Sequence, residues 1–384
     1  MKVLVISHTY ISPINRDKWK LCAYRHPTVT ILVIYPRKWP SSLFSHQSSP
    51  GIEQIAPNCS CTALDTHGAG NELLYVYKSR QLRTILKKFR PDIVHVEQGA
   101  GALCYFQVNF FLRILKIKAR SIFFTWINLK PQLSFKNRLY LKFIEKINMH
   151  HADGAITGNH DAQTLLQQKG FHKPILVLPQ LGVNPEIFKP EDLPTNISRA
   201  HKYVGYIGRF TEEKGIFYLA RAFMQLAANF PQWKLTFIGK GVAENRLHSF
   251  IAHRQMFNRI ELCKPVPHET IAQYLRKLDI LVLPSYDTPQ WREQFGHILI
   301  EAMASGVAVI GSNAGQIPHV IKDSGLIFMQ RNEADLIEKL QTLMQDEVLR
   351  KKIADAGRIR AHAEYSHEVI ADKTYEFWHT ISNT

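Results

Sequence analysis

Two acidic residues, Glu293 and Glu301, lie eight positions apart in the segment EQFGHILIEAMASG. Glu301 stands among apolar residues, where a carboxylate needs a polar partner. On one continuous helix, eight positions correspond to about 12 Å of rise, whereas paired glycosidase carboxylates lie within about 9.5 Å of each other. The two acids could instead contact distant parts of one elongated ligand, because carboxylates accept hydrogen bonds from the vicinal hydroxyls of a ribose or hexose.

Gly296 lies between the two acids and favours a loop followed by a helix over one continuous helix. Backbone N–H groups at the start of that helix, from Gly296 and His297, would then face a phosphate group. The alternative interpretation is an ordinary acid at the amino-terminal end of a half-buried helix.

Two cations follow an earlier apolar run in the segment GYIGRFTEEKG, where Arg209 comes after Gly208 and Lys214 precedes Gly215. Gly208 would let a ligand approach the backbone, and a helix that begins near Gly215 would offer unpaired N–H groups. Two positive charges are enough for a diphosphate. The segment matches neither the GxxxxGK[ST] nor the GxGxxG pattern, so the ordinary NTPase and dehydrogenase functions lose support. A strand–helix loop with surface charges remains the alternative.

The elements around these residues alternate twice between short apolar runs and helical patterns. Short apolar runs are typical of parallel strands that are buried on both faces. The sequence therefore predicts an α/β fold with two doubly wound, Rossmann-like parallel-sheet domains, residues 1–184 and 185–364, joined by a proline-containing linker. Ligands of such sheets bind beyond the carboxyl ends of the strands, which here means the cleft between the domains.

The expected elements can be given as ranges. The predicted strands are 2–7, 28–35, 93–96, 120–125, 154–157, 175–178, 203–207, 234–238, 259–262, 280–284, 307–310 and 325–328. The predicted helices are 72–89, 101–116, 135–150, 159–170, 215–229, 243–253, 268–275, 296–304 and an interrupted stretch from 333 to about 379.

The E-x7-E pattern, preceded by GRFTEEKG, resembles the retaining glycosyltransferases of family 4, which have the GT-B fold. The segment LPQLGVN before FKP is similar to the hinge of that family, and LVLPS is similar to the strand before its E-x7-E loop. The resemblance extends from about residue 152 to residue 325, and covers the first 150 residues only in general layout. It implies a final helix, 365–384, that crosses back to the first domain.

The resemblance also implies roles for the donor-side residues. Arg209 and Lys214 would hold the donor diphosphate and stabilise charge on the leaving nucleotide, Glu301 would accept from the ribose hydroxyls, and Glu293 would hold the donor sugar. Phe295 and Gly296 would offer backbone amides. The implied donor is a nucleoside-diphosphate sugar of the UDP or GDP type, transferred with retention and without a bound metal or other cofactor.

The first domain departs from the family pattern, because Trp126 and Asn128 stand where many relatives have a histidine. Asn128 could contact a sugar hydroxyl but cannot act as a base at neutral pH. His95 and Glu97, which end the preceding strand, could also face the cleft. We expect these four residues on the side of the acceptor, a polysaccharide or a lipid-linked glycan. A nucleotide-sugar epimerase, a phosphorylase of the same fold and a degenerate nucleotide-sugar-binding protein are the alternatives.

The charge is concentrated in the first half of the chain. Residues 1–190 contain 25 Lys and Arg against 10 Asp and Glu, whereas the rest are nearly neutral, with 23 against 22. Three basic groups stand out, the second of them beside aromatic residues that we expect to be exposed, a combination that suits an anionic membrane surface. Solvated helix faces are the alternative, and no nucleic-acid partner is expected. The groups are Lys78, Arg80, Arg83, Lys87, Lys88 and Arg90; Arg113, Lys116, Lys118 and Arg120 beside Phe106, Phe110, Phe111 and Leu112; and Lys130, Lys136, Arg138, Lys142 and Lys146.

The number of cysteines indicates the cellular compartment in which the protein works. The chain has five scattered cysteines and begins with MKVLVISHTY, which predicts a strand rather than a signal peptide. An odd number of cysteines without a signal peptide indicates a reducing cytoplasm. We therefore expect a cytoplasmic protein that can rest on the inner face of the cell membrane. Cys59 and Cys61 have no second pair at zinc-ligand spacing, so no metal site is expected there.

Overall fold

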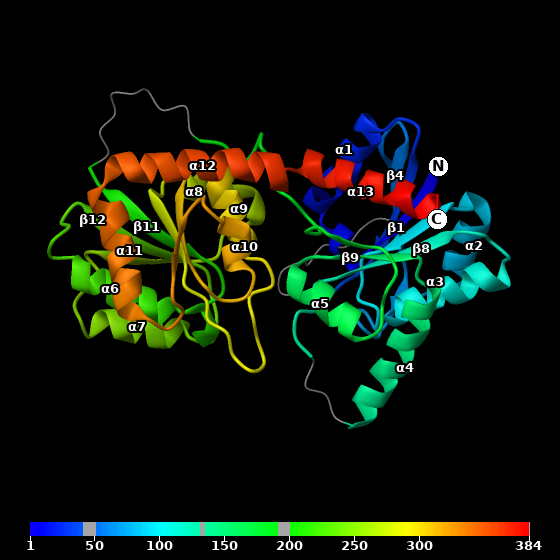
Figure 1. Ribbon diagram of the computed structural model, residues 1–384, viewed down its shortest axis with the longest axis horizontal. Coiled ribbons are helices and arrows are strands. Elements are labelled where there is room, and N and C mark those ends of the chain that lie inside the picture. Colours follow the sequence, from blue (N-terminus) through cyan, green and yellow to red (C-terminus); the bar gives the residue numbers. More distant parts are fainter. Residues whose placement is uncertain (41–50, 131–134, 191–199, 384) are drawn as a thin grey trace. The chain divides into compact units, whose positions relative to one another are not determined.

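The structure is a computed structural model that describes residues 1–40, 51–130, 135–190 and 200–383, without the side chains of residues 135–138. Lys136 and Arg138 of the third basic group therefore lie outside the described side chains. The chain forms two compact units (Figure 1): residues 1–182 together with 367–384, and residues 183–366. The unit borders differ by two residues from the domain borders expected at 184/185 and 364/365.

The first unit is built on a sheet of eight strands that is parallel except for β3. Its central strands are buried on both faces, as expected of short apolar runs between two helix layers. In spatial order the strands are β10 (Ile175–Val177), β9 (Gly154–Thr157), β8 (Arg120–Thr125), β7 (Ile93–Val96), β1 (Lys2–Ile6), β2 (Thr30–Pro36), β4 (Cys59–Leu64) and β3 (Ile52–Ala56). Two short strands, β5 (Thr66–His67) and β6 (Val76–Tyr77), form a separate pair.

Among the described residues, the helices of this unit correct the sequence prediction in two places: the first helix, Asp17–Arg25, was not predicted, and the predicted helix 72–89 is shorter than expected. The predicted helix 72–89 begins only at Ser79, because Tyr77 is extended and exchanges two backbone hydrogen bonds with the side chain of Gln107. Burial of the Tyr75 and Tyr77 rings overrides the helical pattern in this stretch. The helices are α1 (Asp17–Arg25), α2 (Ser79–Phe89), α3 (Leu103–Ile114), α4 (Phe135–His151), α5 (His160–Gln168) and α13 (His367–Ser382).

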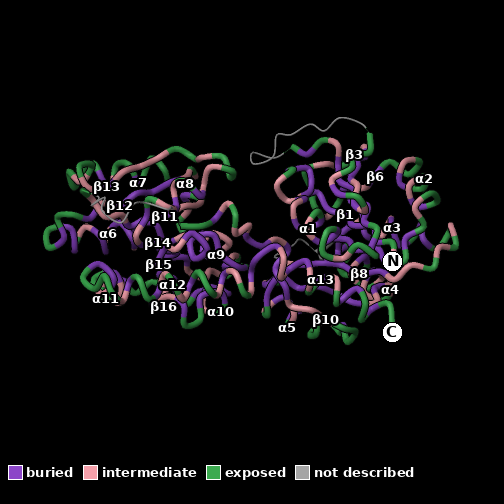
Figure 2. The backbone as a smooth tube through the Cα atoms, turned by 90° about the horizontal axis from the view of Figure 1, so that it is seen from above, coloured by how far each residue is buried: buried purple, intermediate pink, exposed green. Residues whose placement is uncertain are grey.

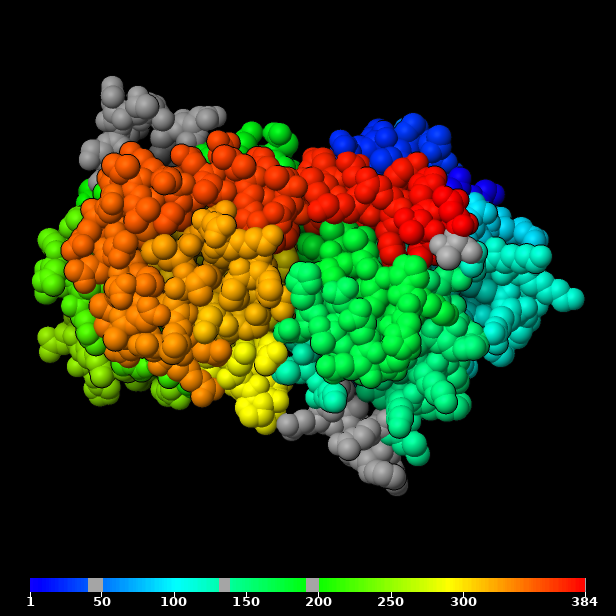
Figure 3. Space-filling model, viewed as in Figure 1, coloured from blue at the N-terminus to red at the C-terminus, as the bar shows by residue number. Residues whose placement is uncertain are grey.

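The carboxyl-terminal helix α13 belongs to the core of the first unit. Trp378 is fully buried and stacks on Trp19 of α1 with ring centroids 5.5 Å apart. At the edge of this contact, Asp372 accepts hydrogen bonds from Arg25 and pairs with His26 at 2.8 Å. Figure 2 colours the residues of α13 by their burial, and Figure 3 shows the same helix, in red, on the surface of its unit. The last residues of the chain therefore stabilise its first helix.

The second unit contains a fully parallel sheet of six strands, in agreement with the predicted doubly wound domain. Its helices are α6 (Ile216–Leu226), α7 (Glu244–Ala252), α8 (Ile271–Leu275), α9 (His297–Ala304), α10 (Ile317–Ile321), α11 (Glu333–Gln345) and α12 (Glu347–Tyr365). The spatial order is β13 (Ile260–Cys263), β12 (Trp233–Ile238), β11 (Lys202–Ile207), β14 (Ile280–Leu283), β15 (Ala308–Ser312) and β16 (Leu326–Phe328).

The strand order of the second sheet reverses between β11 and β14, which are neighbours in space but not in sequence. Loops after the two strands leave the same edge of the sheet and diverge, and this switch point is where open parallel sheets bind ligands. Both sequence segments that carry candidate chemistry follow these two strands.

Replacing Trp378 by alanine should destabilise the first unit by about 3–5 kcal/mol, because the substitution leaves a large cavity in a packed core. Differential scanning calorimetry, in which the two units can unfold in separate transitions, measures the effect. Glu376→Ala, at an exposed position of the same helix, is the matched control. Equal transition temperatures for the two variants would contradict the docking of α13 in the core.

Candidate functional site

The loop after β11 passes very close to the end of β14, and Gly215 makes this approach possible. Gly215 has a φ of +70°, and a Cβ atom at this position would lie 1.9 Å from the carbonyl oxygen of Pro284. Only glycine combines this backbone conformation with such a contact. The amide of Tyr286 also donates to the carbonyl of Glu213 at 2.8 Å, so the two loops are fastened to each other.

This approach brings Lys214 and Glu293 together. The Lys214 ammonium donates to Glu293 Oε2 at 2.6 Å, and the two side chains are only 13% and 10% exposed. The ammonium also lies 4.6 Å from the ring centre of Trp291. Lysine has three N–H donors, so a lysine that holds one carboxylate can still donate to a phosphate oxygen.

Glu293 makes further contacts through both its carboxylate and its main-chain carbonyl. Ser285, which follows β14, donates to Glu293 Oε2 at 2.9 Å, and the Glu293 carbonyl accepts from the amide of Gln316 at 3.1 Å. A Cβ atom at Gly315 would lie 2.2 Å from that carbonyl oxygen. Glu293 is therefore placed by three neighbouring segments rather than by its own loop alone.

Glu301 belongs to the first turns of α9, and the structure confirms the expected loop followed by a helix. Gly296 precedes α9 with a φ of +80°, and the helix begins at His297. The Glu301 side chain is buried, and its Oε1 lies 2.7 Å from His268 Nε2 and 3.5 Å from His297 Nε2. The partner that a buried carboxylate requires is therefore a pair of imidazoles.

His268 is a site residue that the sequence analysis missed. It opens the short helical turn before α8 and was one of 18 histidines without a distinguishing pattern. Its hydrogen bond with Glu301 raises the pKa of His268 above the usual 6.5, although burial acts in the opposite direction. Its ring also contacts the ring of Phe188, with centroids 6.1 Å apart.

The other predicted donor-side residues lie in the loops after β11 and β14. Arg209 is exposed, and its carbonyl accepts from the hydroxyl of Tyr206 at 2.7 Å. Gly208 contacts the next loop, since a Cβ atom at Gly239 would lie 1.9 Å from the Gly208 carbonyl oxygen. Phe295 is buried, and its ring centroid lies 5.5 Å from that of Tyr365 and 6.0 Å from that of His297, a partner of Glu301.

In the first unit, Glu97 lies in a buried polar network. Its carboxylate accepts from Lys18 Nζ at 2.7 Å, from Gln180 Nε2 at 3.0 Å and from the hydroxyl of Tyr10. Burial alone would raise the pKa of Glu97, but Lys18 and the other partners hold it below its usual value. The Glu97 carboxylate is thus committed to neighbouring side chains, and this geometry does not favour the expected contact with an acceptor.

The remaining three acceptor-side candidates have different surroundings. His95 is fully buried with its ring edge-on to the stacked rings of Trp19 and Trp378, and burial lowers its pKa to about 4, so it is neutral at physiological pH. Trp126 is half-buried and donates from Nε1 to the Gln180 side chain at 3.3 Å. Asn128 is 9% exposed. Of the four candidates, Trp126 has the most accessible side chain.

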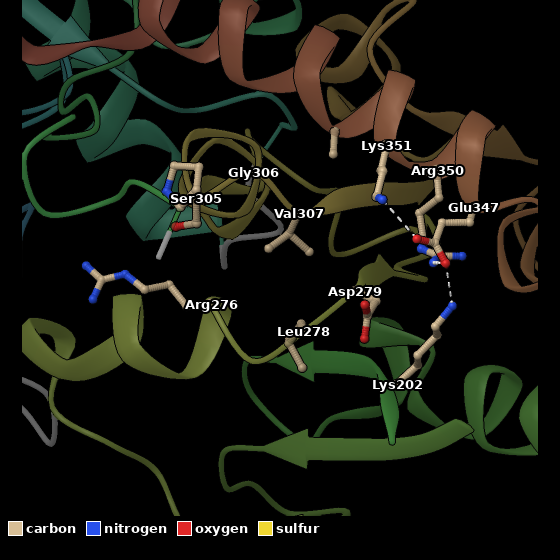
Figure 4. A pocket seen from close by; sticks show the side chains of 12 residues that line it. Lys202, Arg276, Leu278, Asp279, Ser305, Gly306, Val307, Glu347, Arg350 and Lys351 are labelled. Atoms are coloured by element: carbon tan, nitrogen blue, oxygen red, sulfur yellow. Dashed lines mark hydrogen bonds and ion pairs between the residues drawn. The ribbon is translucent and has the colours of Figure 1, made fainter. Parts of the chain in front are cut away.

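A cavity of about 270 Å³ lies at the amino-terminal ends of the strands of the second sheet, whereas the candidate site lies at their carboxyl ends (Figure 4). Lys202, at the start of β11, and residues before β14 and β15 line it. Lys202 and Lys351 donate to Glu347 at 2.8 and 2.9 Å, and these contacts lower the pKa of Glu347 to about 2. The cations at this end of the cavity are therefore paired with a carboxylate of the protein itself.

Among the side chains that the structure describes, no group of three or more His, Cys, Asp or Glu residues could hold a metal ion. No helix within the described ranges has the length and apolar character needed to cross a bilayer.

Comparisons with known proteins show which family the second unit resembles. The family described as "Glycosyl transferases group 1" matches residues 188–360, so this stretch forms a group 1 glycosyltransferase domain. An uncharacterised glycosyltransferase of Methanocaldococcus jannaschii is 27% identical over 228 residues, 59% of either chain. The capsular polysaccharide biosynthesis glycosyltransferase CapM of Staphylococcus aureus is 30% identical over 182 residues, 46% of either chain. The chain thus spans about half to two thirds of the length of such relatives.

Solved structures match the whole chain and confirm the predicted GT-B fold. Sucrose-phosphate synthase from Thermosynechococcus elongatus superimposes with a TM-score of 0.71 and 19% identity, and the match covers 99% of either chain. HepE of Anabaena in complex with UDP gives a TM-score of 0.71 with 16% identity over 99% of this chain and 100% of that one. Because the sequence identities are below 20%, these superpositions establish the fold alone.

The contact between His268 and Glu301 predicts that the pKa of the His268 imidazole is raised. The His268 resonance should titrate above pH 6.5, because the carboxylate stabilises the imidazolium, and Glu301→Gln should move the midpoint down. Any stability from this contact is therefore present below pH 6.5 and lost as the pH rises through the folded-state pKa. NMR of protein with ¹³C-labelled histidine, assigned with His268→Gln, measures the midpoint. A wild-type midpoint at or below 6.5 would show that the contact is absent in solution.

Proposed function

We propose that the protein is a retaining glycosyltransferase of family 4. It transfers a sugar from a nucleoside-diphosphate sugar of the UDP or GDP type to a hydroxyl group of an acceptor. The observation that carries this proposal is the ion pair of Lys214 with Glu293 at the switch point of a group 1 glycosyltransferase domain. A cation and an acid side by side are suited to the diphosphate and the sugar of one donor.

Each donor group has a counterpart among these residues. Lys214 and Arg209 bind the diphosphate, the Glu293 carboxylate holds sugar hydroxyls, and backbone amides of Phe295 and Gly296 complete the contact with sugar and phosphate. Glu301, fixed by two imidazoles, accepts from the ribose hydroxyls. The proposal needs no metal, because the two cations neutralise the diphosphate.

The reaction exchanges one bond at the anomeric carbon for another. The bond between that carbon and the diphosphate oxygen breaks, and the nucleoside diphosphate leaves with the bonding electrons. The acceptor oxygen forms the new bond on the same face of the sugar and gives its proton to the leaving phosphate. Lys214 stabilises the charge that develops on this phosphate, and such a preorganised cation acts most strongly where water is scarce.

The acceptor class is proposed from the relatives and from the basic first unit. A relative in Staphylococcus aureus is named for capsular polysaccharide biosynthesis, and a structural neighbour from Anabaena has been crystallised with UDP-glucose. These names support a nucleotide-sugar donor and a growing polysaccharide or a lipid-linked glycan as acceptor. Trp126 and Asn128 are the acceptor-side candidates that we retain.

Lys214→Met should lower the transfer rate by about 100-fold or more, because it removes the cation that stabilises the leaving group. Release of UDP or GDP from a panel of nucleotide sugars, followed by NMR of the anomeric product, measures rate and stereochemistry. Lys352→Met, at an exposed position of α12, is the matched control, and circular dichroism verifies folding. A normal rate in a folded Lys214→Met variant would remove the proposed role, and an inverted product would exclude retention.

Glu301→Gln should weaken donor binding by about tenfold or more, because a charged acceptor of ribose hydrogen bonds is lost. Isothermal titration calorimetry with the donor identified in the panel measures this change. An unchanged dissociation constant would contradict the ribose contact. Tight donor binding by the wild type without transfer or hydrolysis would instead favour the degenerate binding protein, and a new sugar stereoisomer without an acceptor would favour the epimerase.

A further inference from the structure

Helix α4 (Phe135–His151) has two faces of different character. Its inner side is buried at Leu141, Ile144 and Asn148, which recur every three or four residues. Leu141 contacts the start of α3 so closely that a Cβ atom at Gly101 would lie 2.2 Å from its Cδ1. Asn148 donates to the carbonyl oxygen of Ala100 at 2.7 Å. The inner side thus fixes α4 to the first unit, and the outer side needs a separate explanation.

The outer side of α4 exposes large apolar groups next to cations. Leu139 and Phe143, one helical turn apart, are each 62% exposed. Lys142 and Lys146 are exposed one turn apart beside them. The described residues contain no carboxylate paired with either lysine, and the nearby Glu145 pairs with Lys169 at 2.7 Å.

The neighbouring helix α3 repeats this combination. Phe110 and Ile114 are exposed one turn apart, together with Arg113 between them. Lys116 and Lys118 follow the helix and are also exposed. The carboxyl-terminal ends of α3 and α4 are connected by a hydrogen bond between Arg113 and His151 at 3.1 Å.

The same region corrects the sequence prediction of which aromatic residues are exposed. Phe111 and its neighbour Leu112 are buried together with Val108 in the hydrophobic core of the first unit. Arg120 of the second basic group pairs with Asp153 at 3.0 Å. The exposed surface is therefore defined by other residues, which we call the α3–α4 surface: Phe110, Arg113, Ile114, Lys116, Lys118, Leu139, Tyr140, Lys142, Phe143 and Lys146.

The composition of the α3–α4 surface differs from that of the rest of the molecule. Five of the thirteen large hydrophobic side chains that the described residues expose lie on these two helices. Between residues 103 and 151 the sequence holds nine Lys and Arg against a single acid, Glu145. Clustered apolar groups on a surface indicate an interaction site. A surrounding excess of cations is complementary to anionic headgroups.

We propose that the α3–α4 surface docks on a bilayer that contains anionic lipids. The apolar side chains of α4 and α3 enter the boundary between headgroups and acyl chains, and the lysines and arginines contact the headgroups. This inference does not depend on the proposed transfer reaction. If both hold, docking would keep the first unit next to a lipid-linked or membrane-associated acceptor.

Flotation of the full chain with vesicles tests the docking, using phosphatidylcholine alone or mixed equally with phosphatidylglycerol. The wild type should float with the mixed vesicles and much less with the neutral ones. Leu139→Glu/Phe143→Glu should lower the bound fraction by about tenfold at low salt, and Lys142→Glu/Lys146→Glu should abolish the preference for anionic vesicles. The matched control, Val348→Glu/Ile359→Glu, changes two exposed apolar residues of α12 and should bind like the wild type.

Three results would overturn the proposal. One is equal flotation of the wild type with both vesicle types. Another is an equal loss of binding in the α12 control, which would show a general effect of added acids. The third is unchanged binding by Leu139→Glu/Phe143→Glu together with loss of binding in the lysine variant, because a surface that attracts any polyanion would behave in that way. The assay needs no turnover, so it reads out independently of the transferase activity.

Discussion

The candidate site depends on an ion pair that forms only because two loops touch. Lys214 and Glu293 come from the loops after β11 and β14, and Gly215 provides the contact by its positive φ and its missing Cβ. Removing one member of a buried pair costs about 3–5 kcal/mol, because the other charge is left without compensation. The pair therefore connects both loops at the switch point, while Ser285 donates to the Glu293 carboxylate and Gln316 donates to the Glu293 main-chain carbonyl.

Glu301 is placed by a separate set of contacts on the same side of the sheet. Its partners, His268 and His297, come from the segment after β13 and from the first residue of α9. In this arrangement the buried carboxylate contacts the exposed imidazole of His268, and their hydrogen bond raises the pKa of His268 above its usual value. The two acids thus have different neighbours, as expected if one meets a charged diphosphate sugar and the other a ribose.

Much of the second unit could be predicted from the sequence, because its strands are short apolar runs and its glycines mark turns. The need of Glu301 for a polar partner was also predictable, although its identity was not, since His268 lies 33 positions away in sequence. In the first unit, the predicted helix at 72–78 was wrong because tertiary burial of two tyrosines decided the backbone. Strands β3 and β4 were missed, and β4 lies inside the sheet with neighbours on both sides.

The role of Glu97 shows why strand-end residues alone cannot define an acceptor site. A polar residue at the carboxyl end of a parallel strand can face a ligand or the protein, and the sequence looks the same in both cases. In this protein the Glu97 carboxylate faces other protein groups, because Tyr10, Lys18 and Gln180 donate hydrogen bonds to it from distant parts of the chain.

The most direct test of the account is a crystal structure of the protein with the nucleotide sugar that it turns over. We expect the diphosphate on Lys214, the sugar hydroxyls on Glu293 and the ribose on Glu301. Density for the donor away from these residues, for example in the cavity beside Glu347, would contradict the central claim.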